Sequence, residues 1–365
     1  MQPYERIINA VKHRRSDRLP INYNATPEAH ASIKKYLSVQ QDEELLKKLG
    51  VDIRSVAGRY NGPKELIPGA AINSAPGKDI FGVVWEPKKN QSGTYNEISY
   101  HPLANAKTVR DIKNYNWPSL DWFDFSHLKE QISRINREEK YAIMFFAGGS
   151  FESPWYMRGL ERFLLDLVEC PEIAEEISAH VTDFYLKRAL RAIEASDGQI
   201  TIIGSGGDIG TQRGMMLSPD LWRKHIKPYS TKLIGTFKDM GLITFYHSCG
   251  SIVPVIADLI EMGLDILDPV QPKAVGMEPE KLKKNFGRKL VFHGGIDVQE
   301  LLPFGTPEDV EKEVTRLIHV LGNDGGYIVA PAHAIQADTP PENIWKIYET
   351  AQNSGDQNNG GSNES

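Results

Sequence analysis

The chain has 365 residues, of which 40% are hydrophobic and 25% charged, the composition of an ordinary globular protein. A net charge of -6 gives no electrostatic basis for binding nucleic acid or an anionic membrane, and no run of about 18 apolar residues could span a bilayer. Only Cys170 and Cys249 could pair, and the first residues lack the apolar core of a secretion signal, so we expect a reduced, cytoplasmic protein.

The first fifty residues alternate helix and strand patterns. An amphipathic pattern predicts a short helix over 4–13, and Ile21-Asn22-Tyr23, directly after Pro20, is a candidate for the first strand. A helical stretch then continues to about residue 47 and ends near Gly50. The run Val51–Val56 predicts the second strand.

Residues 57–118 interrupt this alternation. They contain prolines, glycines and two alternating runs, Ile80–Glu86 and Tyr95–His101, separated by the turn-prone segment 88–93. We interpret this part as a β-hairpin insertion after the second strand. An excursion of this length is usually functional, so we expect it to form a lid or a wall of a pocket.

From residue 127 onward, apolar runs and helical patterns alternate regularly. The predicted strands are Tyr141–Phe146, Ile200–Ile203, Leu242–Tyr246, Asp265–Leu267, Lys289–Phe292 and Tyr327–Val329. The predicted helices are 155–167, 171–196, 218–239, 252–262, 278–285, 306–321 and 341–352. Ser218 and Thr306 each stand as a capping hydroxyl before a proline, and Thr339 begins a capping-box spacing that ends at Glu342.

Counting the two early strands, the pattern gives eight strand-then-helix units. That number predicts an α/β protein with a (β/α)8 TIM barrel, formed as a single domain by residues 1–352. An open doubly wound sheet is the alternative, but no Gly-x-Gly-x-x-Gly follows the first strand. Residues 353–365 are polar and glycine-rich, and we expect a disordered tail there.

Polar residues and glycines gather where the predicted strands end, which is where barrel enzymes place their active sites. His247 and Cys249 follow an apolar strand and lie two residues apart, so their side chains point to the same side. Both can bind zinc, and Gly250 allows the chain to turn after them. We choose His333 as the third ligand, with His293 and Asp268 as substitutes. The alternative is a small buried cysteine beside a hydrogen-bonded histidine.

Other polar residues at the strand ends are candidates for substrate binding or catalysis. Asp208 follows a glycine pair and either contacts a ligand or forms an Asx turn, and Asp268 is also a candidate to support a metal ligand. The remaining candidates for substrate contact have structural alternatives of their own: Glu152, Gln212, His293 and Asp297. Capping alone explains Glu342 and Asn343, and Cys170 has no partner in the sequence pattern.

These segments together resemble the uroporphyrinogen decarboxylase superfamily, which has the (β/α)8 fold. The segments that carry the resemblance are Tyr4-Glu5-Arg6, Asp17-Arg18-Leu19-Pro20, His247-Ser248-Cys249-Gly250, Phe292-His293-Gly294-Gly295-Ile296-Asp297, Ala330-Pro331-Ala332-His333 and Thr339-Pro340-Pro341-Glu342-Asn343. True uroporphyrinogen decarboxylases carry arginines after the first strand and a catalytic aspartate after the second. Here residues 19–33 contain no arginine or lysine, and Ala57-Gly58-Arg59-Tyr60 stands where that aspartate would be.

The chain is more similar to another branch, the zinc-dependent cobalamin methyltransferases, whose zinc ligands are a His-x-Cys pair and a later cysteine. His247 and Cys249 match the pair, and the later cysteine falls on His333. A His-Cys-His site carries less negative charge than His-Cys-Cys, so it would be a stronger Lewis acid. The resemblance implies zinc, a corrinoid methyl carrier on a partner protein, and contacts from Asp208 and Gln212 to a small-molecule substrate.

We therefore expect a methyltransferase that moves a methyl group to or from a corrinoid. One alternative is a decarboxylase of a smaller or different substrate than a porphyrinogen, which works without metal and uses Asp208 and His333 as an acid–base pair. The other is a barrel without catalysis that binds a corrinoid or a protein. The early helix and the 57–118 insertion are candidates for a homodimer interface.

Overall fold

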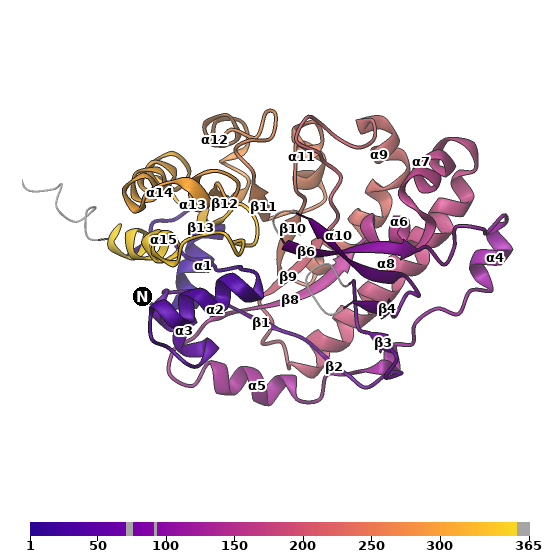
Figure 1. Ribbon diagram of the computed structural model, residues 1–365, viewed down its shortest axis with the longest axis horizontal. Coiled ribbons are helices and arrows are strands. Elements are labelled where there is room, and N and C mark those ends of the chain that lie inside the picture. Colours follow the sequence, from indigo (N-terminus) through magenta and orange to yellow (C-terminus); the bar gives the residue numbers. More distant parts are fainter. Residues whose placement is uncertain (71–75, 91–92, 356–365) are drawn as a thin grey trace, which may run out of the picture.

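The computed structural model describes residues 1–70, 76–90 and 93–355. Its centre is a curled parallel sheet of seven strands in the order β1-β8-β9-β10-β11-β12-β13, surrounded by helices (Figure 1). The strands are β1 (Ile53–Val56), β8 (Ala142–Gly149), β9 (Ile202–Gly206), β10 (Ile243–His247), β11 (Ile266–Val270), β12 (Val291–Ile296) and β13 (Tyr327–Pro331). The expected parallel α/β architecture is confirmed, and the curled sheet is barrel-like.

The predicted first strand is wrong as a strand, because Ile21 makes only an isolated parallel bridge with Val329. The segment nevertheless lies between the two edge strands. Asn22 N donates to Val329 O of β13 (2.9 Å), and the amide of Asp52, directly before β1, donates to Ile21 O (2.9 Å). A short bridging segment therefore joins the edges of the curled sheet where the sequence predicted an eighth strand.

The carboxylate of Asp52 fixes this bridging segment. It is fully buried and accepts hydrogen bonds from Ile21 N (2.8 Å), Arg6 Nη1 (3.0 Å) and Arg18 Nη1 (2.7 Å). Two cations and one amide satisfy a carboxylate that burial alone would make very costly. Because Asn22 follows Ile21, this contact also positions a residue of the site described below.

The predicted helices are present, with breaks at three turns, and the short helices α4, α5 and α13 were not predicted. Their bounds are α1 (Pro3–Val11), α2 (Pro27–Tyr36), α3 (Asp42–Lys48), α4 (Val109–Lys113), α5 (Leu128–Ile135), α6 (Glu152–Arg158), α7 (Leu160–Glu169), α8 (Pro171–Ala195), α9 (Pro219–His225), α10 (Lys227–Asp239), α11 (Val253–Glu261), α12 (Pro279–Phe286), α13 (Leu301–Phe304), α14 (Pro307–Gly322) and α15 (Pro341–Asn353). Among the described residues, no helix is both long and apolar enough to cross a membrane.

The predicted caps of two helices are confirmed, and the third is wrong. Ser218 accepts from Leu221 N, and Thr306 forms a capping box with Asp309. At α15 the N-cap is Pro340, which offers no side-chain cap. Asn343, which we had explained by capping, instead donates from Nδ2 to the carbonyls of Leu302 and Gly305 at the end of α13.

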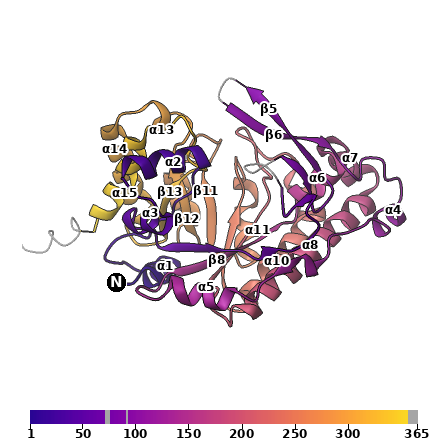
Figure 2. The ribbon, with the colours of Figure 1, turned by 60° about the horizontal axis from the view of Figure 1, so that its bottom comes forward.

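Within residues 57–118, four strands form a separate small sheet in the order β3-β4-β5-β6. Residues 71–75 and 91–92, the latter in the predicted turn 88–93, lie outside the described part of the chain. Its strands are β3 (Leu66–Ile67), β4 (Gly77–Asp79), β5 (Val84–Asn90) and β6 (Gly93–Tyr100), and β5 pairs antiparallel with β6. Figure 2 shows β5 and β6 extending away from the rest of the ribbon. The carboxylate of Asp79 accepts from two backbone amides and from Trp85 Nε1, which anchors the base of this pair. Two further short strands, β2 (Arg59–Tyr60) and β7 (Phe123–Asp124), pair with each other.

The interior of the curled sheet is filled by one apolar cluster. Every second residue of the central strands points inward, and Ile7 and Ala10 of α1 pack against this layer from the amino-terminal end of the strands. The cluster includes Phe245, Ile266 and Val291, all buried. Counting two residues onward from each gives His247, Asp268 and His293, so strand periodicity places three polar side chains on the same inward face. Of the predicted tail 353–365, residues 356–365 lie outside the described part of the chain.

We expect Asp52→Asn to lower the free energy of unfolding by about 3 kcal/mol, because it leaves the buried side chains of Arg6 and Arg18 without a carboxylate. Asp17→Asn is the matched control. Asp17 also pairs with Arg6, but its side chain is 42% exposed, so its loss should cost less than about 1 kcal/mol. Urea-induced unfolding measures both. Equal losses in the two variants would contradict the role given to Asp52.

Candidate metal centre

The backbone after β10 holds two potential metal ligands in place. His247 ends the strand, and Cys249 follows two residues later, as the sequence predicted. Gly250 then adopts a positive φ of 82°, and a Cβ there would lie 2.5 Å from the backbone carbon of Gly210. Both the turn and this close approach require glycine. The loop after β9 is thereby packed directly against the loop after β10.

Packing of these two loops brings Asp208 to the His-x-Cys pair. His247 Nε2 lies 3.6 Å from Cys249 Sγ and 3.5 Å from Asp208 Oδ1. One ligand atom from each of the three residues lies within 4.8 Å of the others. The same Oδ1 accepts a hydrogen bond from Cys249 N (2.8 Å), which fixes the carboxylate.

The two distances from His247 Nε2 suit a zinc ion. Bonds of about 2.0–2.3 Å to a tetrahedral zinc place the donor atoms roughly 3.3–3.8 Å apart, and the two measured distances fall in that range. Imidazole nitrogen, thiolate sulfur and carboxylate oxygen are all zinc donors. The donor set therefore fits zinc.

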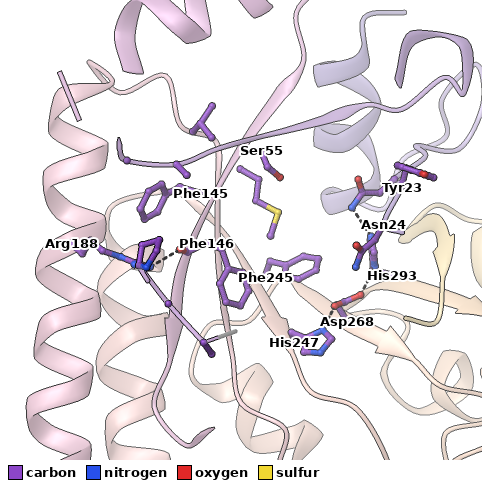
Figure 3. Close-up of a pocket in the computed structure, with 18 of the residues that line it drawn as sticks. Tyr23, Asn24, Ser55, Phe145, Phe146, Arg188, Phe245, His247, Asp268 and His293 are labelled. Carbon is purple, nitrogen blue, oxygen red and sulfur yellow. Dashed lines mark hydrogen bonds and ion pairs between the residues drawn. The ribbon is translucent and has the colours of Figure 1, made fainter. Parts of the chain in front are cut away.

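A chain of hydrogen bonds orients His247. Its Nδ1 lies 2.5 Å from Asp268 Oδ2, and the other oxygen of Asp268 lies 2.5 Å from His293 Nδ1. His293 Nε2 in turn lies 3.0 Å from Nδ2, the side-chain amide nitrogen, of Asn22. As Asn22 donates there, His293 carries its proton on Nδ1 and donates it to Asp268. Figure 3 shows His247, Asp268, His293 and Asn24 along one side of the pocket. With Nδ1 of His247 turned to Asp268, its Nε2 faces Cys249 and Asp208.

The charges around His247 stabilise a positive charge on its ring. Burial opposes the charge on its ring, but Asp268, Cys249 and Asp208 outweigh burial and raise the pKa of His247 well above its usual value. Burial also opposes ionisation of Asp268, yet the two histidines hold its pKa below the usual range. Burial raises the pKa of the Cys249 thiol. A metal ion would replace the protons of both ligands in this field.

His333, the third ligand we expected, lies outside this group of donor atoms. It follows β13, and its ring centroid is 6.3 Å from that of His247 with the ring planes at 61°. Burial and the nearby charge of His247 lower its pKa, so its imidazole is neutral at pH 7. Its side chain lines the cavity next to the candidate metal centre.

Three other predicted site residues do not line this cavity. Glu152 begins α6 and accepts from Tyr156 OH (2.9 Å), and burial followed by the charge of Asp208 raises its pKa. Gln212 is exposed in the loop after β9. Asp297 accepts from the amides of Gln299 (2.8 Å) and Leu301 (3.4 Å) at the start of α13. The contacts of Asp297 are those of a structural cap, which was its alternative reading.

The cavity has a volume of about 800 Å³ and two different walls. Its polar wall contains His247, Asp268, His293 and His333, and its apolar wall is rich in phenylalanine. The apolar wall is formed by Val56, Ile67, Phe123, Phe125, Met144, Phe145, Phe146 and Phe245. Part of the 57–118 insertion, Ile67–Ala70, lines the same cavity.

The sequence analysis missed Arg188, which also lines this cavity. It lies on α8, four residues after Phe184 and three after Tyr185, both of which are buried. An arginine at a position where the helical pattern of α8 places its apolar face is the signal that could have identified Arg188. We had looked for site residues at strand ends alone.

Comparison with known proteins identifies the family. The model of the uroporphyrinogen decarboxylase (URO-D) family matches residues 92–354. The chain is 22% identical to the methylcobamide:CoM methyltransferase MtbA of Methanosarcina acetivorans over 372 aligned residues, covering 96% of this chain and 98% of the relative. The protein of that name from Methanosarcina mazei is 23% identical with the same coverage.

Decarboxylases are also among the relatives. The uroporphyrinogen decarboxylase of Geotalea daltonii is 24% identical over 259 residues, which is 68% of this chain and 70% of the relative. Among solved structures, a methyltransferase from Methanosarcina mazei has the same fold, with a TM-score of 0.69 at 16% identity, covering 96% of this chain and 98% of the other. The resemblance predicted from the sequence is therefore confirmed, and the chain belongs to the uroporphyrinogen decarboxylase (URO-D) family.

Proposed function

We propose that this protein is a zinc-dependent methyltransferase that moves a methyl group to or from a corrinoid. The observation that carries the proposal is the arrangement of Asp208, His247 and Cys249 around one point, with Asp268 behind the histidine. Similarity along almost the whole chain to proteins named methylcobamide:CoM methyltransferase supports the corrinoid part. We propose that a partner protein presents the corrinoid at the cavity.

In this proposal the zinc ligands are His247 Nε2, Cys249 Sγ and a carboxylate oxygen of Asp208. When bound, zinc would act as a Lewis acid on the heteroatom that gives up or receives the methyl group. One neutral and two anionic donors balance the charge of a divalent ion. Asp208 thus supplies the negative charge that our sequence-based set of His247, Cys249 and His333 lacked.

The other residues of the polar wall have supporting roles. Asp268 holds the ring of His247 in one orientation and one tautomer, and His293 and Asn22 hold Asp268. His333 is neutral and lies on the cavity wall, so we propose that it hydrogen-bonds the reacting heteroatom of the substrate. Three protein ligands leave the fourth zinc position to that heteroatom.

The decarboxylase alternative has less support from the cavity. Of the described residues that line the cavity, one is an arginine and none is a lysine. This lining argues against a porphyrinogen with eight carboxylates, which would need more cations, but not against a decarboxylase of a smaller acid. Asp208 also faces His247 and Cys249, so it is poorly placed to act as an acid–base pair with His333.

We expect the purified protein to contain about one zinc per chain and Cys249→Ala to lose it, because the variant removes one of three donors. Cys170→Ala is the matched control, since Cys170 is the other cysteine of the sequence and lies between α7 and α8. Elemental analysis after dialysis measures the metal content. Full zinc content in Cys249→Ala would contradict the proposed site, and absence of zinc from the unmodified protein would favour a metal-independent decarboxylase.

A second pair of variants separates the two candidate third ligands. We expect Asp208→Asn to weaken zinc binding at least about tenfold, because it removes an anionic donor, and His333→Gln to leave the zinc affinity within about twofold. Competition with a chromogenic chelator measures both affinities. The opposite result, with loss on His333→Gln alone, would restore His333 as the third ligand.

The hydrogen bond from Asp268 to His247 should also affect metal affinity. We expect Asp268→Asn to weaken zinc binding about 10–100-fold, since it leaves the orientation and basicity of His247 unsupported. Asp265→Asn is the control, because Asp265 lies three residues earlier and contacts Thr244 and Lys238 instead. The chelator competition should show no loss there. Equal affinities in the two variants would mean that Asp268 does not act through the metal ligand.

A further inference from the structure

Arg188 brings a cation to the apolar wall of the cavity. It extends from α8, and in Figure 3 its side chain lies beside Phe145 and Phe146, with Phe245 between this group and His247. Its Nη2 donates to the carbonyls of Phe146 (3.2 Å) and Ala147 (2.8 Å). The pairing of β8 with β9 shifts register between Phe146 and Gly148, so Arg188 satisfies carbonyls at an irregular point of the sheet.

These two hydrogen bonds involve Nη2, which is one of the three nitrogens of the guanidinium. Nε of Arg188 is buried and has no hydrogen-bond partner within the described part of the chain. Among the residues that the structure describes, no aspartate or glutamate influences its pKa, which burial lowers. Aromatic rings surround it instead, with centroids 5.2 Å away in Tyr185, 5.4 Å in Phe123 and 5.8 Å in Phe145. A half-buried cation without a carboxylate partner is unfavourable, and ring faces offset only part of that cost.

The surroundings of Arg188 are suited to an apolar ligand. Phe146 keeps 46% of its surface exposed although it belongs to a strand of the central sheet, and that surface faces the cavity. Phe123, Phe125 and Phe145 add further aromatic faces to the same wall. Pockets for small molecules commonly combine such an apolar wall with a few placed polar groups.

We propose that the small-molecule substrate of this enzyme is a carboxylate on an apolar body, with its carboxylate bound by Arg188 and its body against the phenylalanine wall. The inference rests on the proposed function, because it places the other end of the substrate at His247 and Cys249. Arg188 forms charge-assisted hydrogen bonds to one carboxylate and neutralises one negative charge. The substrate class is therefore a small apolar acid with a single acidic group near one end.

The test uses isothermal titration of the full-length protein with benzoate and hexanoate as probes, and with the uncharged amides benzamide and hexanamide as their neutral counterparts. We expect at least one acid to bind saturably and its amide to bind at least about tenfold more weakly, the effect of losing one charge-assisted contact. Arg188→Gln should weaken binding of that acid by a similar factor and leave its amide unchanged. Arg188→Lys keeps the charge and should retain much of the binding.

Arg191→Gln is the matched control. Arg191 lies one turn further along α8, is largely exposed and pairs with Asp121, so its loss should not affect the probes. Cys249→Ala distinguishes a carboxylate that binds the metal from one that binds Arg188. Loss of acid binding in Cys249→Ala but not in Arg188→Gln overturns the inference, as does the absence of saturable binding by either acid. Absence of zinc would refute the proposed metal function while leaving this measurement of charge selectivity intact.

Discussion

The carboxylate of Asp268 connects the fold to the candidate centre. It lies between His247 and His293, at 2.5 Å from a ring nitrogen of each, and is buried in the mouth of the curled sheet. A carboxylate in that position is tolerable only if cationic or donor groups surround it. The two histidines supply those groups. Each hydrogen bond to Asp268 also fixes the orientation of the ring that makes it. The free nitrogen of His247 therefore faces Cys249 and Asp208.

The geometry of the parallel strands explains why these groups meet. Phe245, Ile266 and Val291 point into the same apolar layer, and the residues two positions onward are His247, Asp268 and His293. Within the sheet, His247 pairs directly with Asp268. The bridging segment that replaces an eighth strand adds Asn22 from the other side, held through Ile21 and Asp52. The site is an extension of the barrel interior, in which polar residues replace the last apolar layer.

This periodicity also explains what the sequence could predict. Strands, helices and the inward direction of His247 follow from local apolar patterns, and the supporting position of Asp268 was among the alternatives. The first strand was overestimated because the three residues Ile21-Asn22-Tyr23 carry too little pattern to distinguish a strand from a bridge. Thr339 was expected to cap α15, but the chain turns through Pro340 and the hydroxyl remains unpaired.

The third ligand that we propose, Asp208, could not be predicted by the same reasoning. Asp208 and His333 both follow strands, so their positions in the sequence do not rank them. Their difference arises in the loops: Gly207 N donates to His247 O, and Gly250 packs against Gly210, which brings the loop after β9 to the His-x-Cys pair. Such contacts depend on backbone angles that only glycine adopts readily and on the pairing of two loops. Arg188 was missed for another reason, because it reaches the cavity from a helix.

The two ends of the cavity complement each other in charge. A divalent ion would be balanced by its two anionic donors, so the metal end would carry no excess positive charge, whereas Arg188 leaves the phenylalanine end with one positive charge. An uncharged ligand would leave that charge uncompensated, and a polyanion would place further charges against Phe123, Phe145 and Phe146 without partners. A monoanion with an apolar body satisfies both conditions. The same cation that stabilises the irregular part of β8 therefore also sets the charge of the substrate that the cavity accepts.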